Sequence, residues 1–229
     1  MDKRIEKTKC CAFLAAYAAL ILVTVFYTDH LPSDSVIRSY IKIPFYLLAG
    51  TAVIIFFRKD FIEGFSDWKK HYIRNTILII GGFIGNIILA NLAGIPGSLI
   101  YGDQTTKNDS NLDGLFAAFN PVLVFLVVGI LGPLVEEAIF RMILINRGRE
   151  LAKIPLVICV IISSILFMFI HIHSFTAQEF IMNLDKLASG LLFGIIYAST
   201  KNITLSCGIH IINNSLASAM MILSMIIPT

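Results

Sequence analysis

The stretch GPLVEEAIFRMIL, residues 132–144, places two adjacent glutamates and an arginine inside an otherwise apolar run. A charged side chain at the centre of a membrane helix costs about 2.5 to 3.5 kcal/mol on insertion scales, so such residues face the bundle interior and mark function. Glu136, Glu137 and Arg141 are therefore the first candidates for chemistry. Pro133, just before them, lacks a backbone donor, so neighbouring polar groups must satisfy the carbonyl that it frees.

Helical spacing assigns different roles to the two glutamates. Glu137 and Arg141 are four residues apart and lie about 40° apart around a helix, close enough for an ion pair that neutralises both. Glu136 is turned about 100° from Glu137 and is poorly placed to share that arginine. An uncompensated carboxylate in a low dielectric takes up a proton more readily, which suits a general base or acid near neutrality.

The later apolar runs contain few other ionisable side chains. The stretch SSILFMFIHIH places His171 four residues after Phe167, so an aromatic ring would lie beside an imidazole. The stretch SCGIHIINNSL places His210 and Asn214 on one helical face, where an imidazole and an amide can donate to the same point. His173 also follows a phenylalanine by four residues, so His171 is the preferred candidate and His173 the open alternative.

Composition indicates that these residues belong to a membrane protein. The chain has 229 residues, of which 57% are hydrophobic and 14% charged, whereas soluble domains are about 25% charged. Apolar runs of spanning or nearly spanning length recur: Cys10–Tyr27, Ile43–Phe57, Thr76–Ile95, Leu115–Ile145, Ile154–Ile172, Leu187–Thr200 and Ile203–Ile227. We therefore expect an all-α, polytopic membrane helix bundle of about seven or eight transmembrane helices, multi-pass in the cell membrane.

The whole chain, residues 1–229, is expected to form a single membrane domain. Residues 1–114 supply N-terminal spans of low specificity, and residues 115–229 carry the polar motifs on the expected catalytic helices. Depth is the condition that these motifs must meet. Counted from Lys153, His171 lies about 27 Å along its span, whereas His210 lies about 10 Å past Ile203, so tilts or different helix boundaries must close this difference.

Basic residues predict the orientation. Lys and Arg gather at the N-terminus and in residues 58–74 and 147–153, while the segment YGDQTTKNDSNLDG has three Asp and one Lys. The positive-inside rule then places the N-terminus in the cytoplasm and, with seven spans, the C-terminus outside. The segment FRKDFIEGFSDWKKHYIR is expected to lie in the cytoplasmic interface as an amphipathic helix. Because this topology explains the net charge of +3, we expect no nucleic-acid partner.

The motifs together resemble a known family. They occur in the order E-E-x-x-x-R at Glu136, Glu137 and Arg141, then F-x-x-x-H at Phe167 and His171, then H-x-x-x-N at His210 and Asn214. This set resembles the CAAX protease and bacteriocin-processing family (CPBP, or Abi), intramembrane endopeptidases related to the type II CAAX prenyl proteases. The resemblance covers residues 121–218, and the first half of the chain is similar only in its hydrophobic spans.

The resemblance implies hydrolysis of peptide bonds in hydrophobic or membrane-associated peptides or proteins, such as a bacteriocin or pheromone precursor. Glu136 and His171 would activate a water molecule, and His210 and Asn214 would stabilise the oxyanion that forms. The other motif residues would support the site: Glu137, Arg141 and Phe167. The expected partners are the substrate and membrane lipid.

Two alternatives stay open at this point. A metalloprotease would use Glu136, His171 and His210 as ligands of Zn²⁺ with an open position for water. The sequence has no H-E-x-x-H helix, and we expect that no cofactor is required. A non-catalytic membrane partner or bacteriocin self-immunity protein would instead keep the polar residues for helix association. A transporter is a weaker interpretation, because the sequence shows no inverted repeat.

Overall fold

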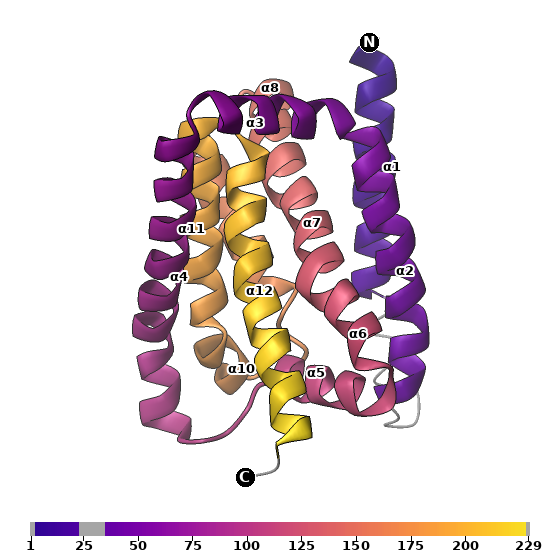
Figure 1. Cartoon of the computed structure of the whole chain (residues 1–229), viewed down its shortest axis with the longest axis vertical. Helices are drawn as coiled ribbons and strands as arrows, with labels where there is room; N and C mark the ends of the chain where they lie inside the picture. The colour runs from indigo at the N-terminus through magenta and orange to yellow at the C-terminus, as the bar shows by residue number, and fades with distance from the viewer. Residues whose placement is uncertain (1–2, 23–34, 228–229) are drawn as a thin grey trace.

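The computed structural model describes residues 3–22 and 35–227, and within these ranges it contains helices and no strands. The expected all-α helix bundle is confirmed. Its longer helices run along the length of the molecule (Figure 1): α1 (Lys3–Leu22), α2 (Ser35–Phe56), α4 (Tyr72–Tyr101), α11 (Leu184–Thr200) and α12 (Ile203–Ile226). Helix α9 (Leu156–Phe169) packs against α11. The shorter ones include α3 (Arg58–Lys70), α5 (Lys107–Ala118) and α10 (Ala177–Met182).

A long central helix carries the glutamates. It continues from α6 (Pro121–Val124) through the π-helical stretch η2 (Phe125–Leu131), α7 (Gly132–Glu137) and the π-helical stretch η3 (Ala138–Arg147) to α8 (Gly148–Ala152). Asn120 begins it by accepting a hydrogen bond from the backbone N–H of Val122 at 3.0 Å, and Pro121 occupies the first turn, where no donor is needed. Its apolar side chains form the centre of the largest core cluster, against α1, α2 and α9.

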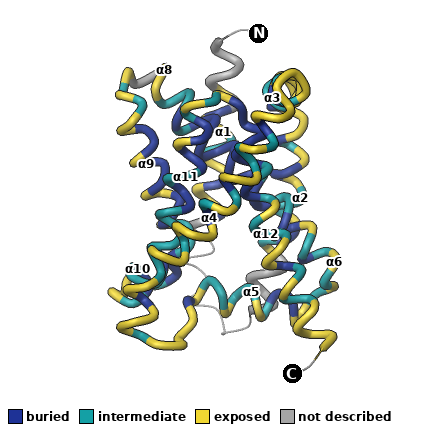
Figure 2. The backbone as a smooth tube through the Cα atoms, turned by 60° about the vertical axis from the view of Figure 1, so that its left-hand side comes forward, coloured by how far each residue is buried: buried dark blue, intermediate teal, exposed yellow. Residues whose placement is uncertain are grey.

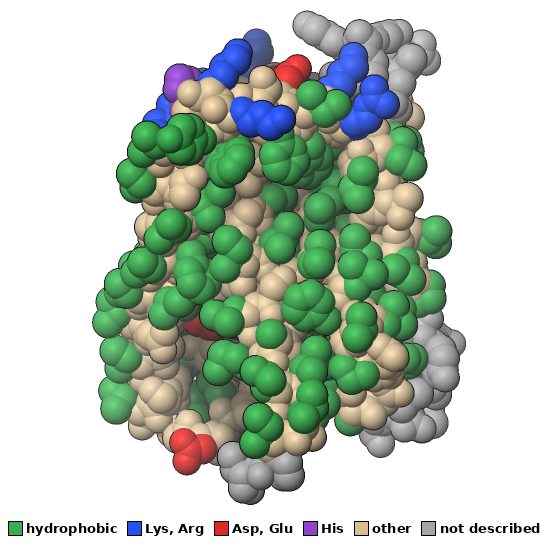
Figure 3. Space-filling model, viewed as in Figure 1, with side chains coloured by type: hydrophobic (Ala, Val, Ile, Leu, Met, Phe, Trp, Pro, Cys, Tyr) green, Lys and Arg blue, Asp and Glu red, His purple; other side chains and the backbone are tan. Residues whose placement is uncertain are grey.

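One end of the bundle is basic. Helix α3 lies across that end, where α1 begins and α8 lies (Figure 1), and Lys and Arg side chains gather there (Figure 3). The amphipathic helix expected in this segment is present, with Ile62 and Phe65 exposed. The Asn202 side chain fastens α3 to the start of α12 by donating from Nδ2 to the Gly64 carbonyl at 3.0 Å. The predicted inside segments thus share one end, as a cytoplasmic N-terminus requires.

Among the described residues, three helices are long and apolar enough to cross a bilayer: Tyr72–Tyr101, Pro121–Glu150 and Ile203–Ile226. A fourth span results if α2 and α3, which meet at a bend of 69°, are counted together. Helix α9 is apolar but has only 14 residues. The prediction of about seven or eight spans therefore stays a prediction.

Several predicted boundaries differ from the structure, and two of these differences concern the cavity described below. The segment between residues 101 and 114 contains the start of a helix, α5, because Thr106 caps it by accepting a hydrogen bond from the Asp109 N–H at 3.1 Å. Helix α11 begins at Leu184 rather than at Leu187, so it includes two charged residues that hydropathy excluded. The predicted end of the first span, Tyr27, lies outside the described residues.

Burial is uneven along the bundle axis. The buried backbone is concentrated in the half nearer α3, whereas the half around α5, α6 and α10 is mostly intermediate or exposed (Figure 2).

Candidate active site

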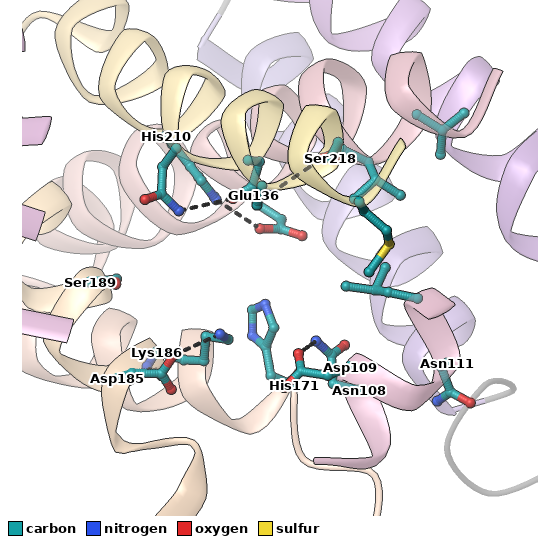
Figure 4. A pocket seen from close by; sticks show the side chains of 18 of the residues that line it. Asn108, Asp109, Asn111, Glu136, His171, Asp185, Lys186, Ser189, His210 and Ser218 are labelled. Carbon is teal, nitrogen blue, oxygen red and sulfur yellow. Dashed lines mark hydrogen bonds and ion pairs between the residues drawn. The ribbon is translucent and has the colours of Figure 1, made fainter. Parts of the chain in front are cut away.

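A cavity of about 400 Å³ lies inside the bundle, lined by residues of α2, α4, α5, α11, α12 and the central helix. All four residues that the sequence motifs single out for catalysis are on its wall: Glu136, His171, His210 and Asn214. Figure 4 shows Glu136 and His210 on one side of this cavity, with His171 and Lys186 reaching toward them from the other. His171 and His210 thus reach the same cavity, although the sequence predicts different depths for them along their spans.

Glu136 lies on α7 with little exposure to solvent. Its Oε2 atom is 3.7 Å from Nε2 of His210 and has no hydrogen-bond partner among the described residues. The Glu136 side chain also lines the cavity, which is where a general base would meet a water molecule. Glu136 is not as isolated as its helical position predicts, because it shares His210 with its neighbour Glu137.

Glu137 is fully buried and joins two partners. Its Oε2 atom lies 3.3 Å from Nε of Arg141, the ion pair expected from their spacing. Its Oε1 atom lies 3.1 Å from Nδ1 of His210, a contact that the sequence did not predict. The carboxylate therefore orients the imidazole of α12 as well as neutralising the arginine.

Aromatic rings enclose the buried arginine. The guanidinium of Arg141 lies 4.9 Å from the ring centre of Phe167 and 5.5 Å from that of Phe193, and its Nη2 donates to the Gly190 carbonyl at 3.4 Å. Phe167 also separates the two imidazoles, with its ring centre 5.0 Å from that of His171 and 5.6 Å from that of His210. This is the aromatic wall that the F-x-x-x-H spacing predicts.

His171 follows the last turn of α9. Its Nδ1 atom lies 2.8 Å from the Phe167 carbonyl oxygen, and since a carbonyl only accepts, Nδ1 carries the proton. The lone pair of Nε2 is then available in the cavity. His173 does not line the cavity, and its backbone N–H donates to Oε2 of Glu179 at 3.4 Å. The geometry favours His171 over His173 for the role assigned by the motif.

Asn214 lies one turn after His210 on α12. Its Nδ2 atom donates to the Val128 carbonyl at 3.4 Å, and Ser215 donates to the Gly129 carbonyl at 3.2 Å. These carbonyls precede Pro133 by five and four residues, the positions whose helical donor the proline lacks. The structure thus confirms that polar groups of a neighbouring helix satisfy the backbone freed by Pro133.

Comparison with known proteins gives two matches. Residues 118–216 match the family model described as "Type II CAAX prenyl endopeptidase Rce1-like". The membrane-embedded CAAX protease MroQ of Staphylococcus aureus (strain USA300) is 26% identical over 183 residues, which cover 76% of this chain and 70% of MroQ. Both matches support the resemblance to the CAAX protease and bacteriocin-processing family that the motifs indicate. No solved structure matches it.

This similarity to CAAX proteases supports intramembrane endopeptidase activity. Together with the apolar helices of the bundle, it makes the chain a multi-pass membrane protein. The match over residues 118–216 contains every motif residue described above.

A metal ion at this site would need three protein ligands close together, such as Glu136, His171 and His210. Within residues 3–22 and 35–227, no three His, Cys, Asp or Glu side chains come together as a metal-binding group. Glu136, His171 and His210 are therefore not gathered into a three-ligand site among these residues. The carbonyl at Nδ1 of His171 and the carboxylate at Nδ1 of His210 do not decide the question, because zinc-binding histidines commonly make such contacts through their second ring nitrogen.

Several polar residues of the cavity wall were missed by the sequence motifs. Asp185 and Lys186 form an ion pair at 2.7 Å, and both lie just before the apolar run in which we searched for charges. Asn86 and Asn213, from α4 and α12, also line the cavity and bond to each other at 3.1 Å. In the sequence Asn86 is an ordinary polar residue of the third apolar run, and nothing there places it beside α12.

Proposed function

We propose that this chain hydrolyses peptide bonds of hydrophobic or membrane-associated peptides or proteins, with a water activated by Glu136 and His171. The observation that carries the proposal is that Glu136, His171, His210 and Asn214, from three separate segments, line one cavity inside an apolar bundle. Such convergence of polar groups in a mostly apolar pocket is typical of an active site.

The proposed reaction uses the carboxylate of Glu136 and the Nε2 atom of His171. A water held by the Glu136 carboxylate and by Nε2 of His171 would lose a proton to Glu136 as it attacks the substrate carbonyl. That proton then passes to the leaving amine as the carbon–nitrogen bond breaks. Neither step requires a metal ion, so the proposal includes no cofactor.

The oxyanion would be held by α12. Asn214 has two amide hydrogens, and one remains for the oxyanion when the other donates to Val128. His210 donates from Nδ1 to Glu137, so it donates to the oxyanion from Nε2 only as the imidazolium. Donors placed where charge develops contribute about 3 to 4 kcal/mol each to lowering the barrier.

The test is cleavage of internally quenched peptides of Leu, Val, Ala, Phe and Gly by the purified protein in liposomes. Glu136→Gln is expected to lower the rate by about 10³-fold or more with an unchanged thermal unfolding midpoint. Glu63→Gln, a change on the surface helix α3, is the matched control and should cleave like wild type. Cleavage by Glu136→Gln at the wild-type rate refutes the mechanism, and binding without any cleavage by wild type indicates a non-catalytic partner or immunity protein.

A chelator arm addresses the metal. We expect cleavage to be unchanged after incubation with EDTA or 1,10-phenanthroline, and elemental analysis to find no stoichiometric zinc. Loss of cleavage with chelator, restored by added zinc, would replace the proposed mechanism with a metalloprotease.

A further inference from the structure

Three asparagine side chains form a hydrogen-bonded chain from α4 to the central helix. Nδ2 of Asn86 donates to Oδ1 of Asn213 at 3.1 Å, and Nδ2 of Asn213 donates to Oδ1 of Asn214 at 3.4 Å. Nδ2 of Asn214 then donates to the Val128 carbonyl at 3.4 Å. All three side chains line the cavity, so the chain connects its α4 wall to the candidate oxyanion donor.

The direction of this chain is set at one end. Pro133 offers no N–H to Val128, whose carbonyl oxygen can only accept, so Asn214 must turn its NH₂ group toward it. Oδ1 of Asn214 therefore faces Asn213 and requires a donor, and the same condition passes along to Asn86. Each of the three amides therefore has one assignment of its oxygen and nitrogen that satisfies the chain, although the two atoms are similar in shape.

The chain ends on an acceptor that lacks a partner. Asn86 is 2% exposed, and its Oδ1 atom has no hydrogen-bond partner among the described residues. A buried acceptor left unpaired is unfavourable by about 1 to 3 kcal/mol, so the site is poised to receive an N–H donor. The other end of the same side chain is already used by Asn213.

The position of Asn86 indicates which donor this is. The cavity wall includes Ile87 and Ala90 of α4 and Ala217 of α12, and the face between these two helices is hollowed (Figure 3). An extended peptide that enters there carries a backbone N–H at every residue, whatever its side chains. A hydrogen bond to the backbone suits a protease whose substrates are apolar, since apolar side chains offer no polar group to bind.

From this geometry we infer that Asn86 is a substrate-binding residue: its Oδ1 accepts a main-chain N–H of a peptide lying between α4 and α12. Through Asn213, the same residue keeps the amide hydrogens of Asn214 directed to the cavity. The inference rests on the proposed function, because it assigns the peptide to the same cavity.

The experiment measures binding without turnover. Glu136→Gln protein in liposomes is titrated into a fluorescein-labelled peptide that wild type cleaves, and binding is followed by the fluorescence anisotropy of the peptide. The titration is repeated with a series of the same peptide, in which each member carries one N-methyl group at a different backbone nitrogen. One N-methyl position should weaken binding about tenfold in Glu136→Gln. That position should have no effect in Glu136→Gln/Asn86→Leu, which binds the parent peptide about tenfold more weakly.

Ser98→Ala is the matched control, because Ser98 lies on the same helix but not on the cavity wall, and it donates to the Ile95 carbonyl of its own helix at 3.0 Å. It should preserve both the affinity and the N-methyl effect. If Asn86→Leu does not fold, Asn86→Asp serves instead. Asn86→Asp keeps the acceptor but not the donor to Asn213. Combined with Glu136→Gln, it should preserve peptide binding and the N-methyl effect, and in the protein that keeps Glu136 it should lower turnover.

The outcomes separate the two ideas. If the N-methyl series acts equally on proteins with and without Asn86, or if Ser98→Ala weakens binding as much as Asn86→Leu, the inference is wrong and the proposed function stands. If Glu136→Gln still cleaves the peptide, the proposed mechanism fails, whichever protein binds the peptide.

Discussion

Glu137 orients His210: the two side chains meet at 3.1 Å between Oε1 and Nδ1, although they are far apart in the sequence. The other oxygen of the same carboxylate faces Arg141 at 3.3 Å, and neither Glu137 nor Arg141 is exposed. One buried carboxylate thus has a structural partner and a partner on the cavity wall. Removing it should affect stability and activity through different atoms.

Glu137→Gln is expected to destabilise the protein by about 3 kcal/mol, because it leaves the Arg141 guanidinium buried and uncompensated. It should also lower cleavage strongly, because Nδ1 of His210 loses the carboxylate that orients the ring. Glu137→Gln/Arg141→Met should recover most of the thermal stability but not the activity. Thermal unfolding in detergent and the peptide-cleavage rate measure the two effects. Recovery of both together would show that Glu137 acts only through Arg141.

His171 and His173 form a natural pair for mutation, since they are two residues apart and only His171 lines the cavity. We expect His171→Ala to lower the cleavage rate by about 10² to 10⁴-fold, because Nε2 no longer assists the water. His173→Ala should keep the wild-type rate, provided that its unfolding midpoint is checked in parallel. The opposite pattern would transfer the catalytic role to His173.

The sequence predicted contacts within one helix better than contacts between helices. The pair of Glu137 and Arg141 follows from helical spacing, and the structure confirms it at 3.3 Å. The contact of Glu137 with His210 could not be predicted, because periodicity gives the buried face of a helix but not the helix that packs on it. The resemblance grouped these residues in one family motif set, but the geometry of their contacts came only from the structure.

Other features have no sequence signal that we used. Hydropathy places the start of the predicted run at Leu187, although α11 begins at Leu184. The first turn of the helix contains the charged residues Asp185 and Lys186, which a search for apolar runs excludes. The π-helical stretches η2 and η3 were also not predicted, since Pro133 is the one residue there that indicates an irregular backbone. The link of Asn86 to Asn213 spans most of the chain and depends on how α4 packs against α12.

Acid should loosen the connection between α3 and α12 through Asp67, at the surface end of the bundle. Its Oδ2 atom accepts hydrogen bonds from Nδ2 of Asn202 at 3.1 Å and Nδ2 of Asn75 at 3.0 Å, and it lies 3.2 Å from Arg74. The hydrogen bond from Asn202 and then that from Asn75 lower the pKa of Asp67 below its usual value of 3.8. Desolvation opposes them, and the charges of Arg74 and His71 add smaller lowering effects.

A carboxylate with a lowered pKa in the folded state stabilises the fold above its unfolded pKa, and this contribution is lost as the pH falls through the folded pKa. The unfolding midpoint of wild type should therefore exceed that of Asp67→Asn at neutral pH. The difference should begin to shrink near the unfolded pKa of about 4 and should be lost as the pH falls through the lower pKa of the folded state. Asp113→Asn, a change at an exposed position of α5, is the control for general effects of charge. A difference that persists unchanged at low pH would mean that Asp67 acts without its charge.

Asn214 and Ser215 allow the catalytic role of α12 to be separated from its structural role. Both donate to carbonyls of η2, at 3.4 Å and 3.2 Å, and a Cβ added at Gly129 would lie 3.3 Å from Cα of Ser215, so the two backbones are close. Only Asn214 lines the cavity. Loss of either donor leaves one carbonyl of the central helix without its partner, so both alanine variants should lose a similar, modest amount of thermal stability.

Catalysis should distinguish them. Asn214→Ala is expected to lower kcat by about 10² to 10³-fold with little change in KM, because the amide donates to charge that develops only in the transition state. Ser215→Ala should keep kcat within about twofold, since its hydroxyl contacts only the backbone of η2. Steady-state kinetics on the quenched peptide, at a temperature below both unfolding midpoints, provide the comparison. Equal losses of kcat in the two variants would mean that Asn214 serves only to satisfy the carbonyl that Pro133 leaves without a donor.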